Sequence, residues 1–208
     1  MAALLELASP RASSFKGIGE ERVRVVIIGS AGSGKTTLAK ALSARLKTPL
    51  VELDALNWSA GWRWRVEAEP DAFLADVERA AEAQDWVIDG NYRRALPLVL
   101  RRATDLIWLD YSRTLVMSRV IRRSFGRALF RRELWPGTGN REDFLRWLRK
   151  DHPIRWAWDT FGRRRLQYGA LFADPLLAGL RRHRLDAPGQ TGALLAKLER
   201  FQREGAPC

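Results

Sequence analysis

The chain has 208 residues, of which 46% are hydrophobic and 29% charged. This is the composition of a single globular domain, and it excludes disordered, collagen-like and fibrous proteins. The only cysteine is Cys208, which excludes a disulfide scaffold, and no apolar stretch reaches the roughly 18 to 20 residues of a membrane helix. Residues 1–20 lack the pattern of a signal peptide, so we expect a loosely ordered leader, one domain over 21–208 and a cytoplasmic location without a membrane partner.

Positive charge is concentrated in one quarter of the chain. The whole sequence carries 36 Lys and Arg against 24 Asp and Glu, a formal net charge of +12. Residues 1–112 hold 15 basic and 15 acidic side chains, whereas residues 113–165 hold 15 basic and 5 acidic ones, a net charge of +10. Such an excess is typical of proteins that bind nucleic acid. Any function proposed for this chain has to account for that segment.

Apolar, β-branched runs alternate with segments of helical periodicity along the chain. This alternation predicts an α/β fold with a five-stranded parallel sheet covered by helices on both faces. An Arg- and Trp-rich helical insertion over 126–168 follows the fourth strand, split at 135–140 and again at Pro153. The predicted strands cover 22–28, 49–54, 86–89, 105–110 and 183–186. The predicted helices cover 37–46, 71–84, 91–103 with an interruption or late start at Pro97, 114–125 with Ser112 as its cap, and 193–201.

The strongest motif is the segment GSAGSGKT at 29–36, which fits the phosphate-binding loop pattern G-x-x-x-x-G-K-[ST]. Its glycines allow the backbone to curl around phosphate, and the following helix adds its positive N-terminus. Lys35 is expected to reach the β- and γ-phosphates of ATP, and the hydroxyl of Thr36 to ligate Mg²⁺. The expected nucleotide-binding residues are Gly29, Ser30, Ala31, Gly32, Ser33, Gly34, Lys35, Thr36 and Thr37.

The other strand ends distinguish among the classes of protein that use this loop. The N-K-x-D motif of GTPases is absent from the sequence. Predicted strands end at Asp54, Asp89 and Asp110, and none of these acids is followed by the Glu that polarises water in dedicated ATP hydrolases. The motifs therefore favour a kinase.

The segments GSAGSGKTT, LDALNW at 53–58, WVIDGNYRR at 86–94 and SRVIRR at 118–123 resemble the adenylate-kinase-like small P-loop kinases. The similarity is greatest to the branch often labelled topology modulation protein or FlaR-like, and it covers about residues 22 to 200. The loop and the D-G-N-Y segment are its most specific parts.

The resemblance implies roles for further residues. Asp89 would hold Mg²⁺ through water, and Arg93 would contact a phosphate of the acceptor. Arg119 and Arg123, four residues apart on one helix, would clamp the transferring phosphoryl group. A loop containing Pro188 and Gly189 would contact the adenine through its backbone.

Asp54 and its neighbours depart from true adenylate kinases, which have a T-G-[DE]-[ML]-x-R run at that place and in some members a tetracysteine lid. The acid at this strand end resembles shikimate- and gluconate-type kinases instead, in which it meets the hydroxyl of the acceptor. Asp54 would then orient or deprotonate the nucleophile. Trp58, with Trp62 and Trp64, would form an apolar wall for stacking on a ring.

Three functions remain open from the sequence. The leading hypothesis is an ATP-dependent, Mg²⁺-requiring phosphotransferase that acts on a nucleoside, nucleotide or other small molecule. The alternatives are a nucleic-acid-binding regulator switched by nucleotide and a kinase of polynucleotide 5′-hydroxyls, both using the basic segment 113–165. Neither the acceptor nor the oligomeric state is set by the sequence.

Overall fold

The computed structural model describes residues 22–130, 133–135, 137–141 and 152–204. The leader expected over 1–20 and part of the expected insertion over 126–168 lie outside these ranges.

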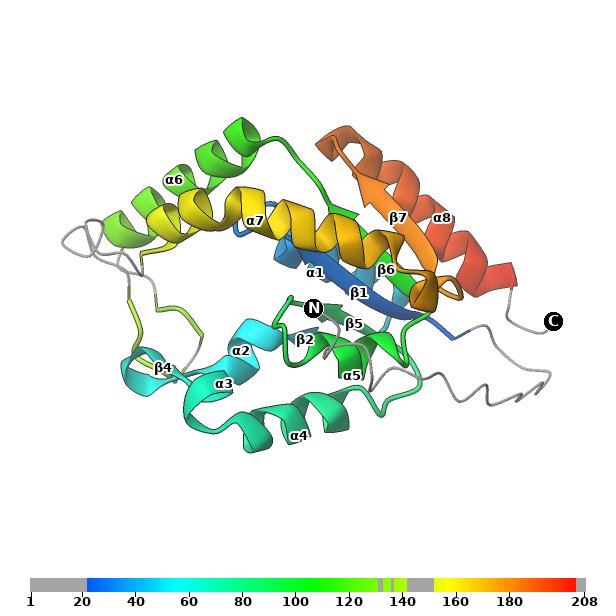
Figure 1. The fold of residues 1–208 in the computed structure, drawn as a ribbon, viewed down its shortest axis with the longest axis horizontal. Coiled ribbons are helices and arrows are strands. Elements are labelled where there is room, and N and C mark those ends of the chain that lie inside the picture. Colours follow the sequence, from blue (N-terminus) through cyan, green and yellow to red (C-terminus); the bar gives the residue numbers. More distant parts are fainter. Residues whose placement is uncertain (1–21, 131–132, 136, 142–151, 205–208) are drawn as a thin grey trace.

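The core is a sheet of five parallel strands, as expected (Figure 1). Their order in the sheet is β2-β5-β1-β6-β7, so β1 lies at the centre, between β5 and β6. The strand order reverses at β1, and in open sheets of this kind ligands bind beyond the carboxyl ends of the strands at such a point. The strands are β1 (Arg24–Gly29), β2 (Leu50–Glu52), β5 (Trp86–Asp89), β6 (Asp105–Leu109) and β7 (Arg181–Leu185).

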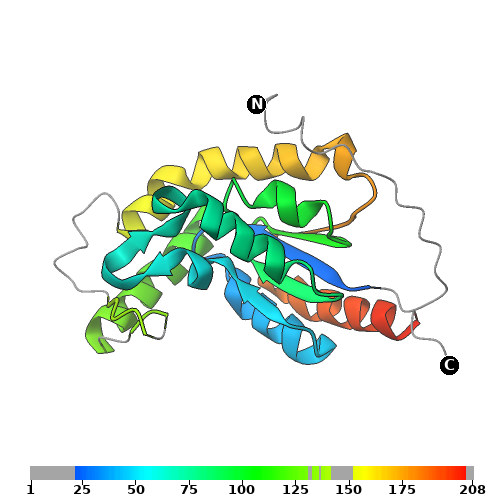
Figure 2. The same ribbon diagram turned by 90° about the horizontal axis from the view of Figure 1, so that it is seen from below.

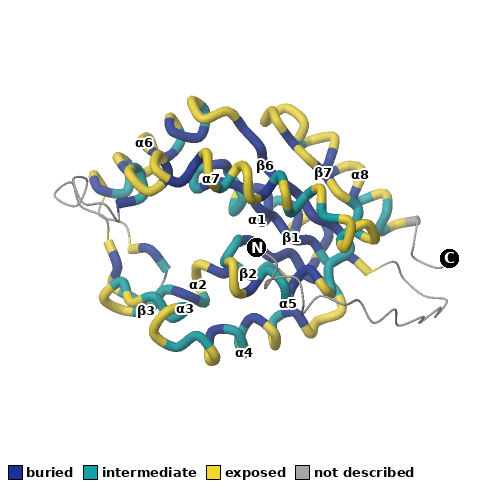
Figure 3. Tube along the Cα trace, in the orientation of Figure 1, coloured by how far each residue is buried: buried dark blue, intermediate teal, exposed yellow. Residues whose placement is uncertain are grey.

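Helices cover both faces of the sheet and form two separate cores (Figure 2). Successive residues of β1 point to opposite faces, and because both faces are covered, the strand is apolar and buried from Val25 onward. Burial is therefore greatest along the central strands (Figure 3). One core is formed with α1 (Lys35–Leu46), α8 (Thr191–Glu204) and the first half of α6 (Arg113–Phe130), and the other with α4 (Pro70–Ala80), α5 (Leu96–Leu100) and the second half of α7 (Pro153–Ala173).

The two longest helices, α6 and α7, form the flanks of the predicted insertion. The Ser112 hydroxyl accepts a hydrogen bond of 3.3 Å from the Leu115 amide, which confirms the expected cap of α6. Pro153, expected to interrupt a helix, instead begins α7, because a proline at the first helical position needs no amide hydrogen. His152 caps this helix by accepting from the Ile154 amide.

The segment after β2 differs from the prediction. The strand expected over 49–54 ends at Glu52, because the chain turns inward to bury Leu53 beneath Gly90, where a Cβ would lie 2.7 Å from the Leu53 Cβ. Asp54 consequently lies in the first turn of a short helix rather than at a strand end. The elements missed here are α2 (Leu53–Asn57), β3 (Trp58–Ser59), η2 (Ala60–Trp62), β4 (Arg63–Trp64) and α3 (Arg65–Ala68), of which β3 and β4 form an antiparallel hairpin.

Two predicted helices are shorter than expected. The late start that Pro97 suggested is confirmed, because α5 begins at Leu96 with Pro97 as its second residue, but the helix expected over 91–103 ends at Leu100. The helix over 71–84 ends at Ala80. Short 3₁₀ segments, η4 (Pro175–Leu177) and η5 (Pro188–Gln190), flank β7.

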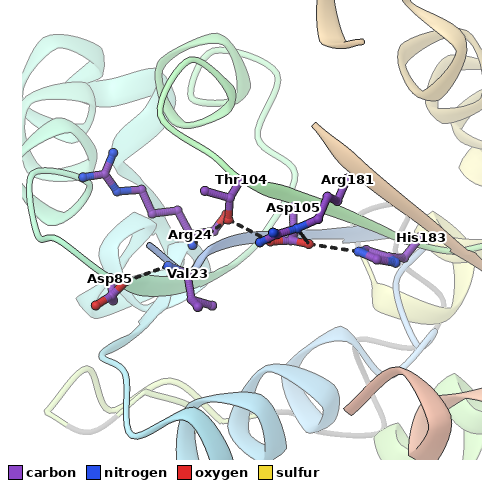
Figure 4. A network of polar contacts seen from close by, with 7 residues as sticks. All are labelled: Val23, Arg24, Asp85, Thr104, Asp105, Arg181 and His183. Carbon is purple, nitrogen blue, oxygen red and sulfur yellow. Dashed lines mark hydrogen bonds and ion pairs between the residues drawn. The ribbon is translucent and has the colours of Figure 1, made fainter. Parts of the chain in front are cut away.

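A buried polar network joins the strands near their amino ends, at the end of the sheet opposite the glycine-rich loop (Figure 4). Asp105, fully buried at the start of β6, accepts two hydrogen bonds from Arg181 at 3.0 and 2.9 Å, and its carboxylate lies 2.9 Å from His183 Nε2. Thr104 donates to the same carboxylate at 2.7 Å and accepts from the Arg24 amide. Both carboxylate oxygens of Asp105 are therefore paired, as a buried charge requires.

Within the described ranges, no helix is long and apolar enough to cross a membrane.

Candidate active site

The glycine-rich loop connects β1 to α1 at the carboxyl end of the central strand. Gly32 and Gly34 adopt φ angles of 82° and 97°, a left-handed conformation that favours glycine. A Cβ on Gly32 would overlap the side chain of Val120 and lie 3.0 Å from the carbonyl oxygen of Val116. Helix α6 thus packs directly against the loop, and only glycine fits at this contact. The curled backbone before a helix N-terminus is the geometry that binds phosphate.

A cavity of about 2600 Å³ lies above this loop, at the carboxyl ends of the strands. It extends between the hairpin β3–β4 and the helices α6 and α7. Gly29, Ser30 and Gly189 do not line it: the first two lie beneath the loop surface, and Gly189 lies in the exposed segment η5. The other expected site residues all line it, namely Ala31, Gly32, Ser33, Gly34, Lys35, Thr36, Thr37, Asp54, Trp58, Asp89, Arg93, Arg119, Arg123 and Pro188.

Lys35 lies in the cavity between opposite and like charges. Its ammonium donates a hydrogen bond of 3.2 Å to the carbonyl of Ser30. Burial lowers the pKa of Lys35, the carboxylates of Asp89 and Asp54 oppose that change, and Arg123 and Arg164 reinforce it. Two carboxylates and two guanidinium groups therefore lie within electrostatic range of this ammonium.

Thr36 and Asp89 form a direct contact between α1 and β5. The Thr36 hydroxyl donates to Asp89 Oδ2, while the other carboxylate oxygen, Oδ1, is buried and has no hydrogen-bond partner among the described residues. Burial raises the pKa of Asp89, against the effects of Lys35 and Thr36, which lower it. An unsatisfied buried carboxylate oxygen next to a hydroxyl is a donor set that suits a hard cation such as Mg²⁺.

Asp54 is an exposed residue that lines the same cavity as the loop. The Tyr92 hydroxyl donates a hydrogen bond of 2.6 Å to Asp54 Oδ1, and this bond fixes the carboxylate. Burial, followed by the negative charge of Asp54, raises the pKa of Tyr92, so its hydroxyl stays protonated and continues to donate. A carboxylate held in this way can accept a hydrogen bond from an incoming hydroxyl.

The arginine side chains differ in their surroundings. Arg119 donates a hydrogen bond of 2.9 Å to the Ser33 carbonyl, and its guanidinium lies 5.3 Å from the centre of the Tyr111 ring. It thus connects α6 to the phosphate-binding loop itself. Arg123, one turn further along α6, and Arg93, after β5, line the cavity with more exposed side chains.

Five tryptophans line the cavity and contact one another at its mouth. Trp135, between α6 and α7, stacks on Trp58 with ring centres 5.5 Å apart and an interplanar angle of 18°. Trp62 and Trp64 contact Trp58 in edge-on geometry, and Trp64 also contacts Trp156 of α7. The expected apolar wall is therefore present, but the stacking contact of Trp58 is made with Trp135.

Asn140 fastens the hairpin to the segment between α6 and α7. Its side chain, 2% exposed, accepts from the Trp62 amide at 2.9 Å and donates to the Ser59 carbonyl at 3.0 Å. Both hydrogen bonds connect residues about 80 positions apart in the sequence. At the mouth of the cavity, the hairpin is therefore joined to this segment by hydrogen bonds from the Asn140 side chain as well as by the indole rings.

Several site residues were missed from the sequence. Asn91 and Tyr92 belong to the D-G-N-Y segment, so the motif contains a signal for them, although the resemblance assigns roles only to Asp89 and Arg93. Arg164 and Tyr168, one turn apart on α7, also line the cavity and hydrogen-bond to each other at 2.9 Å. In the sequence Arg164 is one of three consecutive arginines, and no pattern distinguishes it from its neighbours.

Comparison with known proteins supports the nucleotide-binding loop and the fold. Residues 25–88 match the model of the family described as ATPase family associated with various cellular activities (AAA). Comparison with curated protein sequences gives no match.

Two solved structures illustrate the similarity of fold. A shikimate kinase from Bacteroides thetaiotaomicron is 16% identical with a TM-score of 0.50, and the match covers 87% of this chain and 98% of that one. A putative kinase from Chloroflexus aurantiacus is 18% identical with a TM-score of 0.51, covering 87% of this chain and 99% of that one. The chain has a P-loop NTPase-like fold that it shares with structures of small kinases.

Proposed function

We propose that this protein is an ATP-dependent phosphotransferase that transfers the γ-phosphoryl group to a hydroxyl of a small molecule. The observation that carries the proposal is Asp54, which is held by Tyr92 and exposed to the same cavity as Lys35. The motifs around Asp54 and Asp89 further support membership of the topology modulation, or FlaR-like, branch of the adenylate-kinase-like kinases.

The phosphates of ATP would be bound by the loop over 29–36. The backbone amides and the N-terminus of α1 favour an anion, and the Lys35 ammonium can pair with the β- and γ-phosphates. Arg119 supports this loop through the Ser33 carbonyl, and Arg123 supplies a further positive charge in the cavity. Pro188 lies at the edge of the cavity and supports the expected place of the adenine.

The residues Thr36 and Asp89 fit a Mg²⁺ ion that is bound together with the nucleotide. In the described part of the chain, no group of three His, Cys, Asp or Glu side chains could hold a metal, so further ligands would come from phosphate oxygens and water, as Mg²⁺ prefers. When bound, the ion would neutralise charge on the β- and γ-phosphates. The unpaired Asp89 Oδ1 is the observation that supports this assignment.

Asp54 would orient the acceptor. Its carboxylate accepts the hydrogen of the acceptor hydroxyl, whose oxygen forms a bond to the γ-phosphorus as the bond between that phosphorus and the β,γ-bridging oxygen breaks. ADP leaves with the bridging oxygen, and the hydroxyl proton passes to Asp54 and then to solvent. Lys35 and the arginines stabilise the charge that spreads over the transferring group.

The distribution of the basic residues favours a small acceptor over a polynucleotide. Of the 15 basic residues in 113–165, six line the cavity, namely Arg119, Arg122, Arg123, Arg127, Arg163 and Arg164. Others are engaged within the protein: Arg165 pairs with Asp110, Arg155 with Asp159, and Arg113 lies 3.7 Å above the Trp158 ring. Much of the charge that suggested nucleic acid therefore points to the cavity or is paired.

ADP release in the presence of a panel of acceptors tests the proposal. The panel holds nucleosides, nucleoside monophosphates, small polyols, hydroxy acids and oligonucleotides with a free 5′-hydroxyl. We expect one small-molecule class to raise ADP release above the rate without acceptor, and Asp54→Asn to abolish that increase. Asp71→Asn, the same change on the exposed first turn of α4, is the matched control. Stimulation by the oligonucleotides alone would contradict a small acceptor, and an unchanged Asp54→Asn variant would contradict the role of Asp54.

A further inference from the structure

Tyr168 is a buried tyrosine in the wall of the cavity, and the mechanism above does not use it. It lies on α7, is 4% exposed and presents its hydroxyl to two donors. The Asn91 side-chain amide and Arg164 Nη1, the latter at 2.9 Å, both donate to this oxygen. Burial raises the pKa of Tyr168, so the group remains a neutral hydroxyl at physiological pH.

Asn91 extends this contact to the phosphate-binding loop. The same side-chain nitrogen donates a hydrogen bond of 2.9 Å to the carbonyl of Gly29, the first residue of the loop. Hydrogen bonds therefore form a series that runs from Gly29 to Asn91, from Asn91 to Tyr168 and from Tyr168 to Arg164. Three separate parts of the chain, β1, the loop after β5 and helix α7, are joined by this series.

Helix α7 is also held in place at Arg165, the residue next to Arg164. Asp110, buried at the end of β6, accepts hydrogen bonds from Arg165 at 2.7 and 3.1 Å and from Arg184 at 3.1 and 2.6 Å. Because this bidentate geometry defines both the distance and the direction of a guanidinium group, the backbone that carries Arg164 has a defined position over the sheet.

Arg164 occupies the part of the cavity that contains the loop lysine. It lines the same cavity as Lys35, and its positive charge contributes to lowering the pKa of Lys35. A long arginine side chain loses conformational entropy when it is held in one place, so a fixed partner for its guanidinium reduces the cost of presenting it to a ligand. The Tyr168 hydroxyl is such a partner.

We propose that Tyr168 is a positioning residue, which together with Asn91 holds the Arg164 guanidinium toward the terminal phosphate of the bound nucleotide. This inference rests on the proposed nucleotide site. The nucleotide then contacts a unit in which the loop and helix α7 are already connected, and Arg164 discriminates ATP from ADP.

Calorimetric titration with the non-hydrolysable analogue AMP-PNP and with ADP, both with Mg²⁺, tests this proposal without an acceptor. We expect Arg164→Ala to weaken binding of the triphosphate by about tenfold or more, with a much smaller effect on ADP. The quantity to compare is the ratio of the affinities for AMP-PNP and ADP. Tyr168→Phe, which removes only the hydroxyl, should change this ratio in the same direction by a smaller factor. In the Arg164→Ala background Tyr168→Phe should add nothing, because its effect acts through Arg164.

Arg155→Ala is the matched control: it removes one positive charge from the same helix at an exposed pair with Asp159 and should leave the ratio unchanged. If Tyr168→Phe does not fold, Asn91→Ala interrupts the series from the other side and should change the ratio alike. An unchanged ratio in Tyr168→Phe, or an additive effect in the double variant, would overturn the positioning role. Failure of the wild-type protein to bind either nucleotide would instead refute the proposed function.

Discussion

The hydroxyl of Thr36 donates a hydrogen bond to the carboxylate of Asp89, 53 residues later in the sequence. This contact brings the first turn of α1 to the end of β5 and leaves Asp89 Oδ1 buried without a partner in the part of the chain that the structure describes. We therefore expect Asp89→Asn to weaken the Mg²⁺-dependent component of ATP binding by about 10- to 100-fold, because an amide is a poorer ligand for a hard cation and its bound water.

Titration of ATP with and without Mg²⁺ measures this component in each variant. Asp71→Asn on the surface of α4 serves as the control and should behave as the wild-type protein. An equal response of the Asp89→Asn variant and the wild-type protein to Mg²⁺ would refute the assignment of Asp89 to the cation.

The contact between Gly32 and α6 predicts a second effect on nucleotide binding. Gly32→Ala places a methyl group against Val120 at a φ of 82°, so both steric overlap and backbone strain act on the loop. We expect this variant to bind ATP at least about tenfold more weakly, which corresponds to ~1.4 kcal/mol or more.

Gly137 offers a matched control for that experiment. Its φ is 83°, almost the same as that of Gly32, but a Cβ there would meet nothing within 4 Å among the described atoms. Gly137→Ala should therefore carry the backbone strain alone and leave ATP affinity near the wild-type value. Equal affinities of the two variants would show that the packing of α6 on the loop does not matter.

Asn140 holds the hairpin β3–β4 against the segment between α6 and α7, so Asn140→Ala should loosen the cavity mouth. The amide of Trp62, which donates to Asn140 Oδ1, should exchange with deuterium about five- to tenfold faster in the variant, as expected for the loss of one hydrogen bond. The amide of Val66 donates to Asn57 instead and is an internal control. Unchanged exchange at Trp62 would mean that the indole rings alone close the mouth.

The network around Asp105 predicts a dependence of stability on pH. Burial alone would raise the pKa of Asp105, but hydrogen bonds from His183, Arg181 and Thr104 outweigh it and hold the pKa below the usual value of 3.8. Because the pKa is lower in the folded state, this group stabilises the fold above its unfolded pKa, and that stabilisation is lost as the pH falls through the folded value.

Asp105→Asn should accordingly lower the free energy of unfolding at pH 7 by about 2 to 3 kcal/mol. The difference from the wild-type protein should narrow below about pH 4, as measured by urea unfolding at several pH values. Asp159→Asn, which breaks an exposed pair with Arg155, should cost at most about 1 kcal/mol. ATP affinity should not change in Asp105→Asn, since the network lies at the opposite end of the sheet; a pH-independent difference in stability would contradict the ionised state of Asp105.

The sequence predicts the sheet and the glycine-rich loop well, because both depend on local patterns. A β-branched run before GSAGSGKT defines β1, the loop and α1 together, and the apolar runs before Asp89 and Asp110 define β5 and β6. The walls of the cavity that are formed by the hairpin β3–β4 and by α7 depend on contacts between distant segments. Asn140 bonds to the hairpin across about 80 residues and Tyr168 to Asn91 across 77, and no local periodicity predicts such pairs.

The contrast between local patterns and contacts of distant segments also explains why the predicted strand end at Asp54 and the predicted ligand-stacking role of Trp58 differ from the structure. The sequence pattern continues the strand through Leu53, but burial of Leu53 beneath Gly90 turns the chain into α2. Tryptophan is a residue type that often stacks on ligand rings, and only the fold shows that Trp58 stacks on Trp135 instead.

Calorimetric titration of Mg²⁺-ATP into the wild-type protein and the Lys35→Ala variant tests most directly whether the cavity at the carboxyl ends of the strands is a nucleotide site. Lys197→Ala, the same substitution on the exposed side of α8, is the control. We expect one ATP per chain for the wild-type and control proteins, with an affinity lower by about 10- to 100-fold or undetectable for Lys35→Ala. Equal binding by the wild-type protein and Lys35→Ala, or no binding by the wild-type protein, would contradict this expectation.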